Sequence, residues 1–465
     1  MAAVRLSPAE RLTRWAYALL TTVLQPLVLL RAVWRARQEP GYAHAPAERL
    51  GWYSKASPGA DDRPSTPVPL LWIHAVSLGE TRAARILVAA LRVQGVPFRL
   101  LLTHSTATGW AEGQALLQPG DRQTWLPWDA PGPVRRFLRT FQPSVGVLME
   151  TELWPVLTHG CRSARVPLLM VNGRLNARSL RAALRLAWLS RPAYAALDGL
   201  WAQTPEDAQR FAQAGRTPDG VLGNLKFDAP PNPEARARGL QWRQRLGRPV
   251  VMLASAREGE EAAFFKEILA LAHGSKQLFA AENEVLMPPI WLVVPRHPQR
   301  FDAVARLAET MGFRVGRRRD WPVDGPSSPQ PHAQPELWLG DSLGEMELYY
   351  SLSTVALLGG SFGPWGGQNL IEAAACGCPV VMGPHTFNFQ QAAERAEAEG
   401  AAVRVPDMAG GLAQALQWLA NPAGCAQRSA AAVQFSERHR GAAERTATAV
   451  AERLARWRVN APSGR

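Results

Sequence analysis

The chain has 465 residues, of which 47% are hydrophobic and 20% are charged, and these proportions exclude a disordered protein. Its length exceeds that of one ordinary core, so we expect at least two domains. Lysine and arginine exceed aspartate and glutamate by 52 − 39 = 13, which favours anionic partners. These basic residues form no long run and no recognisable nucleic-acid module, so the sequence argues against DNA or RNA binding.

An apolar segment from Trp15 to Leu30 lies near the N-terminus, between Arg14 and Arg31. It is slightly shorter than the roughly 17–25 residues of a spanning helix, and no signal-peptide cleavage site follows it. A short signal-anchor, an interfacial helix and a buried soluble helix all remain open. Tryptophans and arginines at both ends suit lipid headgroups, so we favour membrane attachment for residues 1–40.

Short apolar runs then alternate with amphipathic stretches, which predicts parallel sheets covered by helices. The runs LLWIHAV, FRLLLTHS, VGVLME, PLLMVNG and GLWAQT predict a first domain over residues 41–228. The Pro- and Arg-rich residues 229–248 are expected to be a linker. Runs from VVMLASA to PVVMGP then predict a second doubly wound domain over residues 249–465, including the last helices, one of which could cross back to the first domain.

The second domain contains the most specific motif, GGSFGPWGGQNLIEAAACGCPVVMGP, from Gly359 to Pro384. Its glycines leave a strand and a helix begins near Asn369, so backbone amides there are expected to bind phosphate. Glu372, one turn later, could accept hydrogen bonds from ribose hydroxyls. The alternative is a tight turn followed by an exposed acid.

Three further segments of this domain follow predicted strands, and carboxyl ends of parallel strands are where open α/β sheets bind ligands. Each residue also has an ordinary structural interpretation, but their recurrence at one edge favours a ligand site. The candidates are Ser255, Arg257, Arg296, Gly344, Glu345 and Met346.

The first domain has an acceptor-side set. Glu80, in HAVSLGE, stands where a buried strand becomes a helix, and it is either a catalytic carboxylate or a first-turn residue. Glu150 and Glu152 follow another strand directly, and a half-shielded carboxylate there could act as a base. Lys226, in GNLKFD, is either a site cation or a surface residue.

Several chemistries lack their motifs. There is no Gly-x-Ser-x-Gly, Walker A or His-Glu-x-x-His sequence, and the first strand-to-helix turn is not Gly-x-Gly-x-x-Gly. The four sparse cysteines indicate a reducing compartment, and Cys376 and Cys378 lack a second pair for a metal. We therefore predict no metal and no cofactor. The remaining interpretation is an enzyme that uses a nucleotide sugar and neutralises the phosphate of this substrate with basic residues.

The chain resembles the 3-deoxy-D-manno-octulosonic acid (Kdo) transferases of bacterial lipopolysaccharide biosynthesis. The resemblance covers nearly the whole chain. It is carried by YAHAPAERLGW, WIHAVSLGE, METELWP, GNLKFD, VPRHPQRF, GDSLGEM, GGQNLIEAAACGCPVVMGPHTFNF and RHRGAAERT, in that order. One departure is Gln368, which stands where the family commonly has histidine.

The resemblance implies a GT-B fold, in which two Rossmann-like domains face a cleft, and an inverting glycosyltransferase. It implies CMP-Kdo as donor, a lipid A precursor (lipid IVA) as acceptor, and the cytoplasmic face of the bacterial inner membrane as location, with no protein partner evident. Carried onto this chain, the general base falls on Glu80, and Glu152 and Lys226 match active-site positions. Arg296, Gly344, Glu345, Met346, Asn369 and Glu372 match CMP-binding segments. A UDP-sugar transferase or epimerase, and a non-catalytic membrane-bound scaffold, are the alternatives.

Overall fold

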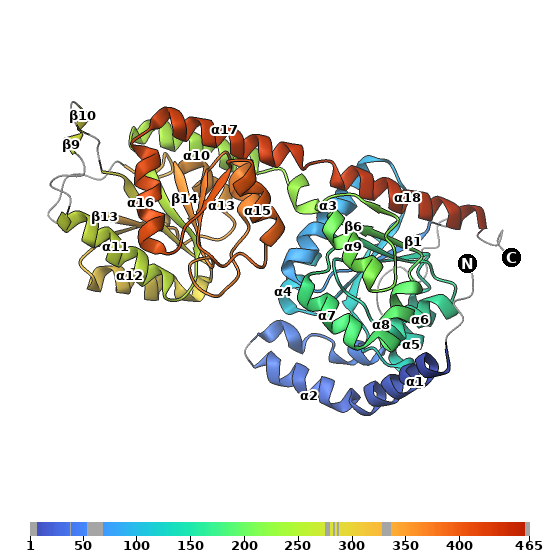
Figure 1. The fold of residues 1–465 in the computed structure, drawn as a ribbon. Coiled ribbons are helices and arrows are strands. Elements are labelled where there is room, and N and C mark those ends of the chain that lie inside the picture. The colour runs from blue at the N-terminus through green and yellow to red at the C-terminus, as the bar shows by residue number, and fades with distance from the viewer. Residues whose placement is uncertain are drawn as a thin grey trace. The chain divides into compact units, whose positions relative to one another are not determined.

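The structure is a computed structural model that describes residues 7–37, 39–53, 68–274, 280–281, 284–285, 288–327 and 336–460. The chain forms two compact units (Figure 1). The first comprises residues 1–228 and 440–465, and the second comprises residues 229–439. Each contains a parallel seven-stranded sheet, which confirms the predicted α/β architecture.

The sheet of the first unit has the strand order β3-β2-β1-β4-β5-β6-β7, with all neighbours parallel. The strands are β1 (Leu70–His74), β2 (Arg99–His104), β3 (Arg122–Trp125), β4 (Val145–Met149), β5 (Leu168–Gly173), β6 (Gly199–Ala202) and β7 (Gly220–Val221). The chain changes direction across the sheet between β1 and β4. Ligands of doubly wound sheets bind at such a switch point.

Helices cover both faces of this sheet. They are α3 (Leu78–Val93), α4 (Ala107–Gln114), α5 (Pro131–Phe141), α6 (Pro155–Ser163), α7 (Ala177–Arg185), α8 (Ala187–Ala195), α9 (Pro205–Gln213) and α18 (Ala442–Asn460). One core joins the sheet to α3 and α18, and the other joins it to α5, α6 and α9. In α3 the buried residues Ala84, Leu87, Val88 and Leu91 recur at helical spacing, which explains the face it buries.

The N-terminal apolar segment forms two helices, α1 (Pro8–Val23) and α2 (Gln25–Ala36), which meet at an angle of 49°. Pro26 lies in the first turn of α2, where its missing N–H and its ring prevent the helix from continuing straight. Within the described residues no single helix is long and apolar enough to cross a membrane. The bent pair meets that test by length and composition only.

Helix α1 is attached to the first unit through buried polar contacts. Tyr17 donates a hydrogen bond to the carboxylate of Asp129 (3.0 Å), which also accepts from the amides of Val156 and Leu157 at the start of α6. The indole of Trp128 donates to the carbonyl of Thr21 (2.7 Å). The face of α1 that carries Tyr17 is therefore fixed on the first unit, and its opposite face is exposed.

The second unit repeats the architecture with the strand order β12-β13-β11-β8-β14-β15-β16. Its strands are β8 (Val250–Ala256), β11 (Ile290–Pro295), β12 (Arg314–Arg317), β13 (Glu336–Leu339), β14 (Val355–Leu358), β15 (Val380–Met382) and β16 (Ala402–Arg404), beside a short ribbon of β9 (Ala280–Ala281) and β10 (Glu284–Val285). The switch point lies between β8 and β14.

Its helices are α10 (Pro233–Leu246), α11 (Glu260–Gly274), α12 (Phe301–Thr310), α13 (Met346–Leu352), α14 (Leu370–Ala375), α15 (Gln390–Ala398), α16 (Met408–Leu419) and α17 (Pro422–Arg438). The expected linker, residues 229–248, mostly forms α10, so that prediction was wrong. Helix α10 packs on α13, and Gly239 allows the close approach, since a Cβ there would lie 2.5 Å from the carbonyl oxygen of Leu348.

The end of the chain also differs from the predicted second domain of residues 249–465, because residues 440–465 belong to the first unit. Asp228 caps α18 by accepting hydrogen bonds from the amides of Gly441 and Ala443. Val450 and Leu454 are buried in the core beside α3. The suggestion that one of the last helices crosses back to the first domain is confirmed.

Candidate active site

Glu80 follows β1 and occupies the first turn of α3. Ser77 caps this helix, since its hydroxyl accepts from the Glu80 amide (3.4 Å) and donates to Oε1 of Glu80 (3.0 Å). Oε2 of Glu80 accepts a hydrogen bond from the amide of Val76 (2.9 Å). Glu80 is therefore a first-turn residue whose carboxylate belongs to a reciprocal cap, and this position is compatible with a catalytic role. This cap also holds it beside the switch point.

The surroundings of Glu80 favour its protonated form. Burial raises the pKa of Glu80 to about 8, and the negative charge of Glu150 adds to this rise. The Val76 hydrogen bond opposes the shift, and Glu152 contributes a smaller rise. A carboxylate with this proton affinity can accept a proton from a hydroxyl near neutral pH.

Glu150, Glu152 and Lys226 complete this cluster in the first unit. Glu150 directly follows β4, the neighbour of β1, and adopts a left-handed conformation with φ of 57°. Nζ of Lys226 lies 2.9 Å from Oε1 of Glu150, and both side chains are largely buried. Burial raises the pKa of Glu152, and Glu150 raises it further. The structure therefore brings together all three predicted first-domain residues.

Two residues outside the predicted set organise this cluster. Glu150 was noticed in the sequence beside Glu152, but it is the partner of Lys226. Asn172, at the end of β5, has φ of 54°, and its side-chain oxygen accepts from the amide of Leu225 (3.1 Å). Asn172 thereby holds the turn that carries Lys226. Asparagine is enriched among residues with a left-handed backbone, so an asparagine near the end of a predicted strand was the available signal.

Replacing Lys226 tests the electrostatics of this cluster. In Lys226→Met the charge of Glu150 is no longer neutralised, so the pKa of Glu80 rises and less of it is ionised at neutral pH. We expect kcat/KM at pH 7 to fall about tenfold and its pH profile to move to higher pH. Lys266→Met, on α11, is the matched control. A profile identical to that of the wild type would contradict the proposed coupling.

The predicted donor residues lie at the carboxyl ends of adjacent strands of the second unit. Ser255 is the penultimate residue of β8, Arg257 follows β8, Arg296 follows β11, and residues 344–346 follow β13. The Ser255 hydroxyl and the sulfur of Met346 are 3.9 Å apart, so two of these segments are in contact. With the glycine-rich loop that follows β14, one edge of the sheet thus carries groups from four neighbouring strands.

Arginine side chains supply the positive charge at this edge, beside a histidine. The guanidinium of Arg257 lies 4.6 Å from the ring centroid of Trp365 and donates to Nε2 of His297. Burial, and then the charges of Arg257 and Arg296, lower the pKa of His297. His297 is therefore neutral at pH 7, and the arginines carry the charge that an anionic ligand would meet.

Glu345 and Asn369 make defined structural contacts in the second unit. Glu345 accepts from Arg318 (2.9 Å) and Ser342 (2.6 Å). Asn369 caps α14, since its side-chain oxygen accepts from the amide of Ile371 (3.2 Å). Glu372 lies one turn further along the same helix. These residues are placed along one edge, but each of the first two is already hydrogen bonded within the protein.

The first part of the glycine-rich loop after β14 is held by a carboxylate of the protein, ahead of the helix start near Asn369 where the sequence predicts phosphate-binding amides. Oε2 of Glu260 accepts from the amides of Arg257 (2.8 Å) and Gly360 (2.7 Å). Oε1 accepts from the amides of Phe362 (3.1 Å) and Gly363 (3.3 Å). A buried carboxylate of the protein therefore takes three loop amides. The sequence patterns gave no indication of this role for Glu260.

The comparisons with known proteins agree with these features. The 3-deoxy-D-manno-octulosonic-acid transferase (kdotransferase) family profile matches residues 44–229. The chain is 45% identical to a 3-deoxy-D-manno-octulosonic acid transferase of Bordetella pertussis over 449 residues, covering 95% of this chain and 99% of that protein. The chain belongs to the 3-deoxy-D-manno-octulosonic acid transferase family.

A second member of this transferase family, from Haemophilus influenzae, is 32% identical over 388 residues, covering 81% of this chain and 84% of that protein. A glycosyltransferase structure from Rickettsia africae superposes with a TM-score of 0.54 at 12% identity, over 83% of this chain and 98% of that one. The fold is therefore GT-B, and the protein is a glycosyltransferase of the Kdo transferase family. Membership of this family favours that activity over the UDP-sugar enzyme and the scaffold.

Proposed function

We propose that this protein transfers Kdo from CMP-Kdo to a glucosamine hydroxyl of a lipid A precursor (lipid IVA), with Glu80 as general base. The observation that carries the proposal is the position of Glu80. It lies at the switch point of the acceptor unit, with a pKa raised to about 8 by burial and by Glu150. Family membership supports the sugar, and the raised proton affinity supports the role.

In the proposed step the carboxylate of Glu80 takes the proton of the acceptor hydroxyl as its oxygen attacks the anomeric carbon of Kdo. The bond between that carbon and the phosphate oxygen of CMP breaks, and CMP leaves with the electron pair from the opposite face. The configuration is therefore inverted. Arg257 and Arg296 would stabilise the charge of the departing phosphate. Glu152 and Lys226 would adjust the charge around the base.

The other candidate residues of the second unit are proposed to bind the CMP part of the donor or to hold the residues that bind it. Ser255 and Met346 would contact CMP, as would the backbone of Gly344, which adopts φ of 76° and where an added Cβ would meet open space. Glu372 would accept hydrogen bonds from the ribose hydroxyls. Glu345 and Asn369 would act indirectly, because their side-chain oxygens already accept hydrogen bonds from Arg318 and Ile371. No further cofactor enters the proposed step.

The location that we propose is the cytoplasmic face of the inner membrane. Leu12, Trp15, Leu19 and Val23 form a stripe on α1, and each is at least half exposed. Their spacing puts them on one face of the helix, opposite the face that Tyr17 fixes on the domain. An outward apolar stripe beside arginines is typical of a helix that lies in the membrane interface.

Transfer itself is tested with purified full-length protein, CMP-Kdo generated in the assay, and lipid IVA as acceptor. The expected result is a product heavier than lipid IVA by the mass of one or more Kdo residues, and that mass gives the number transferred. Folded protein that binds CMP but leaves lipid IVA unmodified would refute the acceptor. Transfer from a UDP-sugar in place of CMP-Kdo would refute the donor.

The pH dependence tests the state of the base. Protonated Glu80 cannot accept a proton, so kcat/KM is expected to rise about tenfold per pH unit below the pKa of Glu80, which is about 8, and to level off above it. The measurement is initial rate against pH at low acceptor concentration, with CMP-Kdo resupplied. A rate that is highest in mild acid and falls towards pH 8 would contradict the assignment.

A further inference from the structure

A groove of about 890 Å³ runs along the first unit between α1, α5 and α6, and Trp457 of α18 also lines it. Its walls are largely apolar and include Trp15, Val134, Leu138 and Trp457. Gly160 lets α6 pack tightly on α5 at its floor, since a Cβ there would lie 2.7 Å from a methyl carbon of Val134. The groove can therefore hold a hydrocarbon chain.

The rim of this groove is positively charged. Arg14, Arg135, Arg139 and Arg165 line it, and no aspartate or glutamate is among its described lining residues. Within the part of the chain that the structure describes, no carboxylate lies within ion-pair distance of these four guanidiniums, and the last three are exposed. The groove thus combines an apolar interior with positive charge that is not compensated locally.

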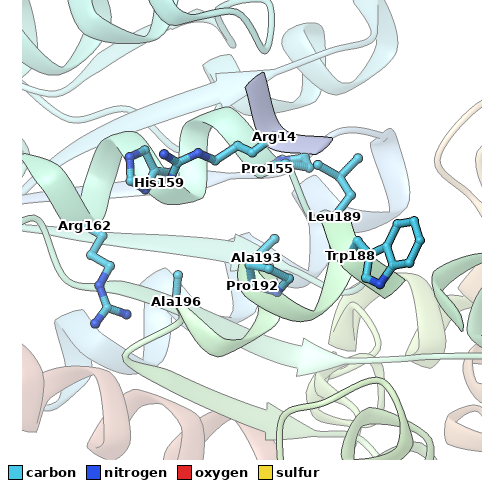
Figure 2. A pocket seen from close by; sticks show the side chains of 9 residues that line it. All are labelled: Arg14, Pro155, His159, Arg162, Trp188, Leu189, Pro192, Ala193 and Ala196. Atoms are coloured by element: carbon cyan, nitrogen blue, oxygen red, sulfur yellow. Dashed lines mark hydrogen bonds between the residues drawn. The ribbon is translucent and has the colours of Figure 1, made fainter. Parts of the chain in front are cut away.

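Arg14 connects the groove to α1. Its Nη1 lies 2.9 Å from Nδ1 of His159, and Figure 2 shows this pair at a second, smaller pocket, which both residues also line. A guanidinium only donates, so Nδ1 of His159 is the acceptor. Burial, and then the charge of Arg14, lower the pKa of His159. His159 is therefore neutral, and Arg14 keeps the positive charge at this end.

Two of the arginines of the groove lie away from the proposed acceptor site. Arg139 lies in the last turn of α5, before β4, and Arg165 lies just before β5, so both belong to the amino-terminal edge of the sheet. Glu80 follows β1 at the carboxyl-terminal edge. Strands of five residues separate these edges by roughly 16 Å. A ligand head group bound by Arg139 and Arg165 is therefore not the sugar that reacts at Glu80.

We infer that this groove binds a bilayer glycerophospholipid with a negatively charged head group. Its acyl chain would occupy the apolar interior, and its phosphate would lie at the arginines. Charge complementarity supports this occupant, as does continuity with the outward stripe, since Trp15 belongs to both. The inference rests on the membrane attachment proposed above and adds lipid selectivity to it: the enzyme would hold a lipid that is not its substrate.

The test measures lipid retained by the detergent-solubilised full-length protein after incubation with an equimolar mixture of phosphatidylglycerol and phosphatidylcholine, followed by gel filtration and mass spectrometry. We expect near-stoichiometric phosphatidylglycerol on the wild type. The triple variant Arg135→Gln, Arg139→Gln, Arg165→Gln should retain about tenfold less, because each arginine contributes to holding the phosphate. Ala164→Trp fills the groove without changing its charge and should give the same loss.

Matched controls separate a site from general surface charge. Arg181→Gln, Arg185→Gln and Arg191→Gln together remove equal charge from exposed positions on α7 and α8, and Ala182→Trp adds an equal side chain on α7. Both should retain lipid like the wild type. Equal loss in the control and groove variants, or no selectivity for phosphatidylglycerol, would overturn the inference.

Two further readouts separate lipid binding from self-association and from the transfer reaction. A change of sedimentation mass in the groove variants would mean that a second copy of the chain occupies the groove, and would overturn the lipid proposal. Transfer to detergent-dispersed lipid IVA, measured in parallel, is independent of retention. Failed transfer with retained phosphatidylglycerol refutes only the proposed reaction, whereas transfer without retention refutes only the lipid site.

Discussion

Glu80→Gln is expected to lower kcat for Kdo transfer about a thousandfold, within the range that a general base contributes. The amide can still accept a hydrogen bond from Val76, so the cap of α3 is retained, but it cannot take a proton from the acceptor hydroxyl. CMP binding should be unchanged, because the donor candidates belong to the second unit. Single-turnover rates measure the transfer step, CMP titration measures donor binding, and product masses identify what is transferred.

The chain offers a matched control for this substitution. Glu10 occupies the same third position of α1, where it forms a capping box with Ser7, but it is only partly buried. Glu10→Gln should change kcat by less than about twofold, since its hydrogen bonds are replaced and no reacting group lies there. A Glu80→Gln protein that transfers Kdo at the wild-type rate would show that the base is another group.

The architecture was readable from sequence where strands are buried on both faces. Runs such as LLWIHAV and VVMLASA are continuous and apolar because parallel strands lie between two layers of helices, and both became central strands. The edge strands β3, β7, β12 and β16 were missed. They have two to four residues and are only partly buried, so they lack a periodic pattern.

The wrong boundaries have a different cause. Residues 229–248 are rich in proline and arginine, which suggests a linker, but Pro233 stands at the first position of α10, where proline is favourable. The arginines lie on a helix whose small residue Gly239 faces α13. Amino-acid composition shows which residues a segment contains, but it does not show which neighbouring helix or sheet the segment packs against. The return of α18 to the first unit has the same cause, because its composition does not show which of the two units its buried face packs on.

The candidate site could be located but not resolved by sequence. Most of the residues that the sequence singled out lie at the carboxyl-terminal edges of the two sheets, as predicted. Lys226 and its partner Glu150, however, are 76 residues apart, and no rule of sequence spacing connects them. Similarly, the acidic run at residues 258–261 contains three environments. Glu258 is exposed, Glu260 holds the glycine loop, and the fully buried Glu261 pairs with Arg300 (2.8 Å). Helical position alone made all three look like first-turn acids.

Glu260→Gln is expected to destabilise the second unit by about 3 kcal/mol, because an amide replaces one oxygen of a carboxylate that accepts four backbone hydrogen bonds. Two amide N–H groups then face a donor and lose their acceptor. The measurement is urea unfolding of the full-length protein with a fluorescence signal from the second unit. Exposed Glu258→Gln is the control and should alter the free energy of unfolding by less than about 0.5 kcal/mol.

The same substitution should weaken CMP binding by at least about tenfold, measured by calorimetric titration at a temperature where the variant is folded. Glu260 joins the amide of Arg257 to the glycine loop, so its loss releases the arginine that lies over Trp365 and is proposed to meet the phosphate. If phosphate instead bound the loop amides directly, freeing two of them would leave affinity unchanged or increase it. Weaker binding in Glu260→Gln therefore supports phosphate recognition by side chains that a buried carboxylate positions, and tighter binding would instead support recognition by the loop amides that Glu260 holds.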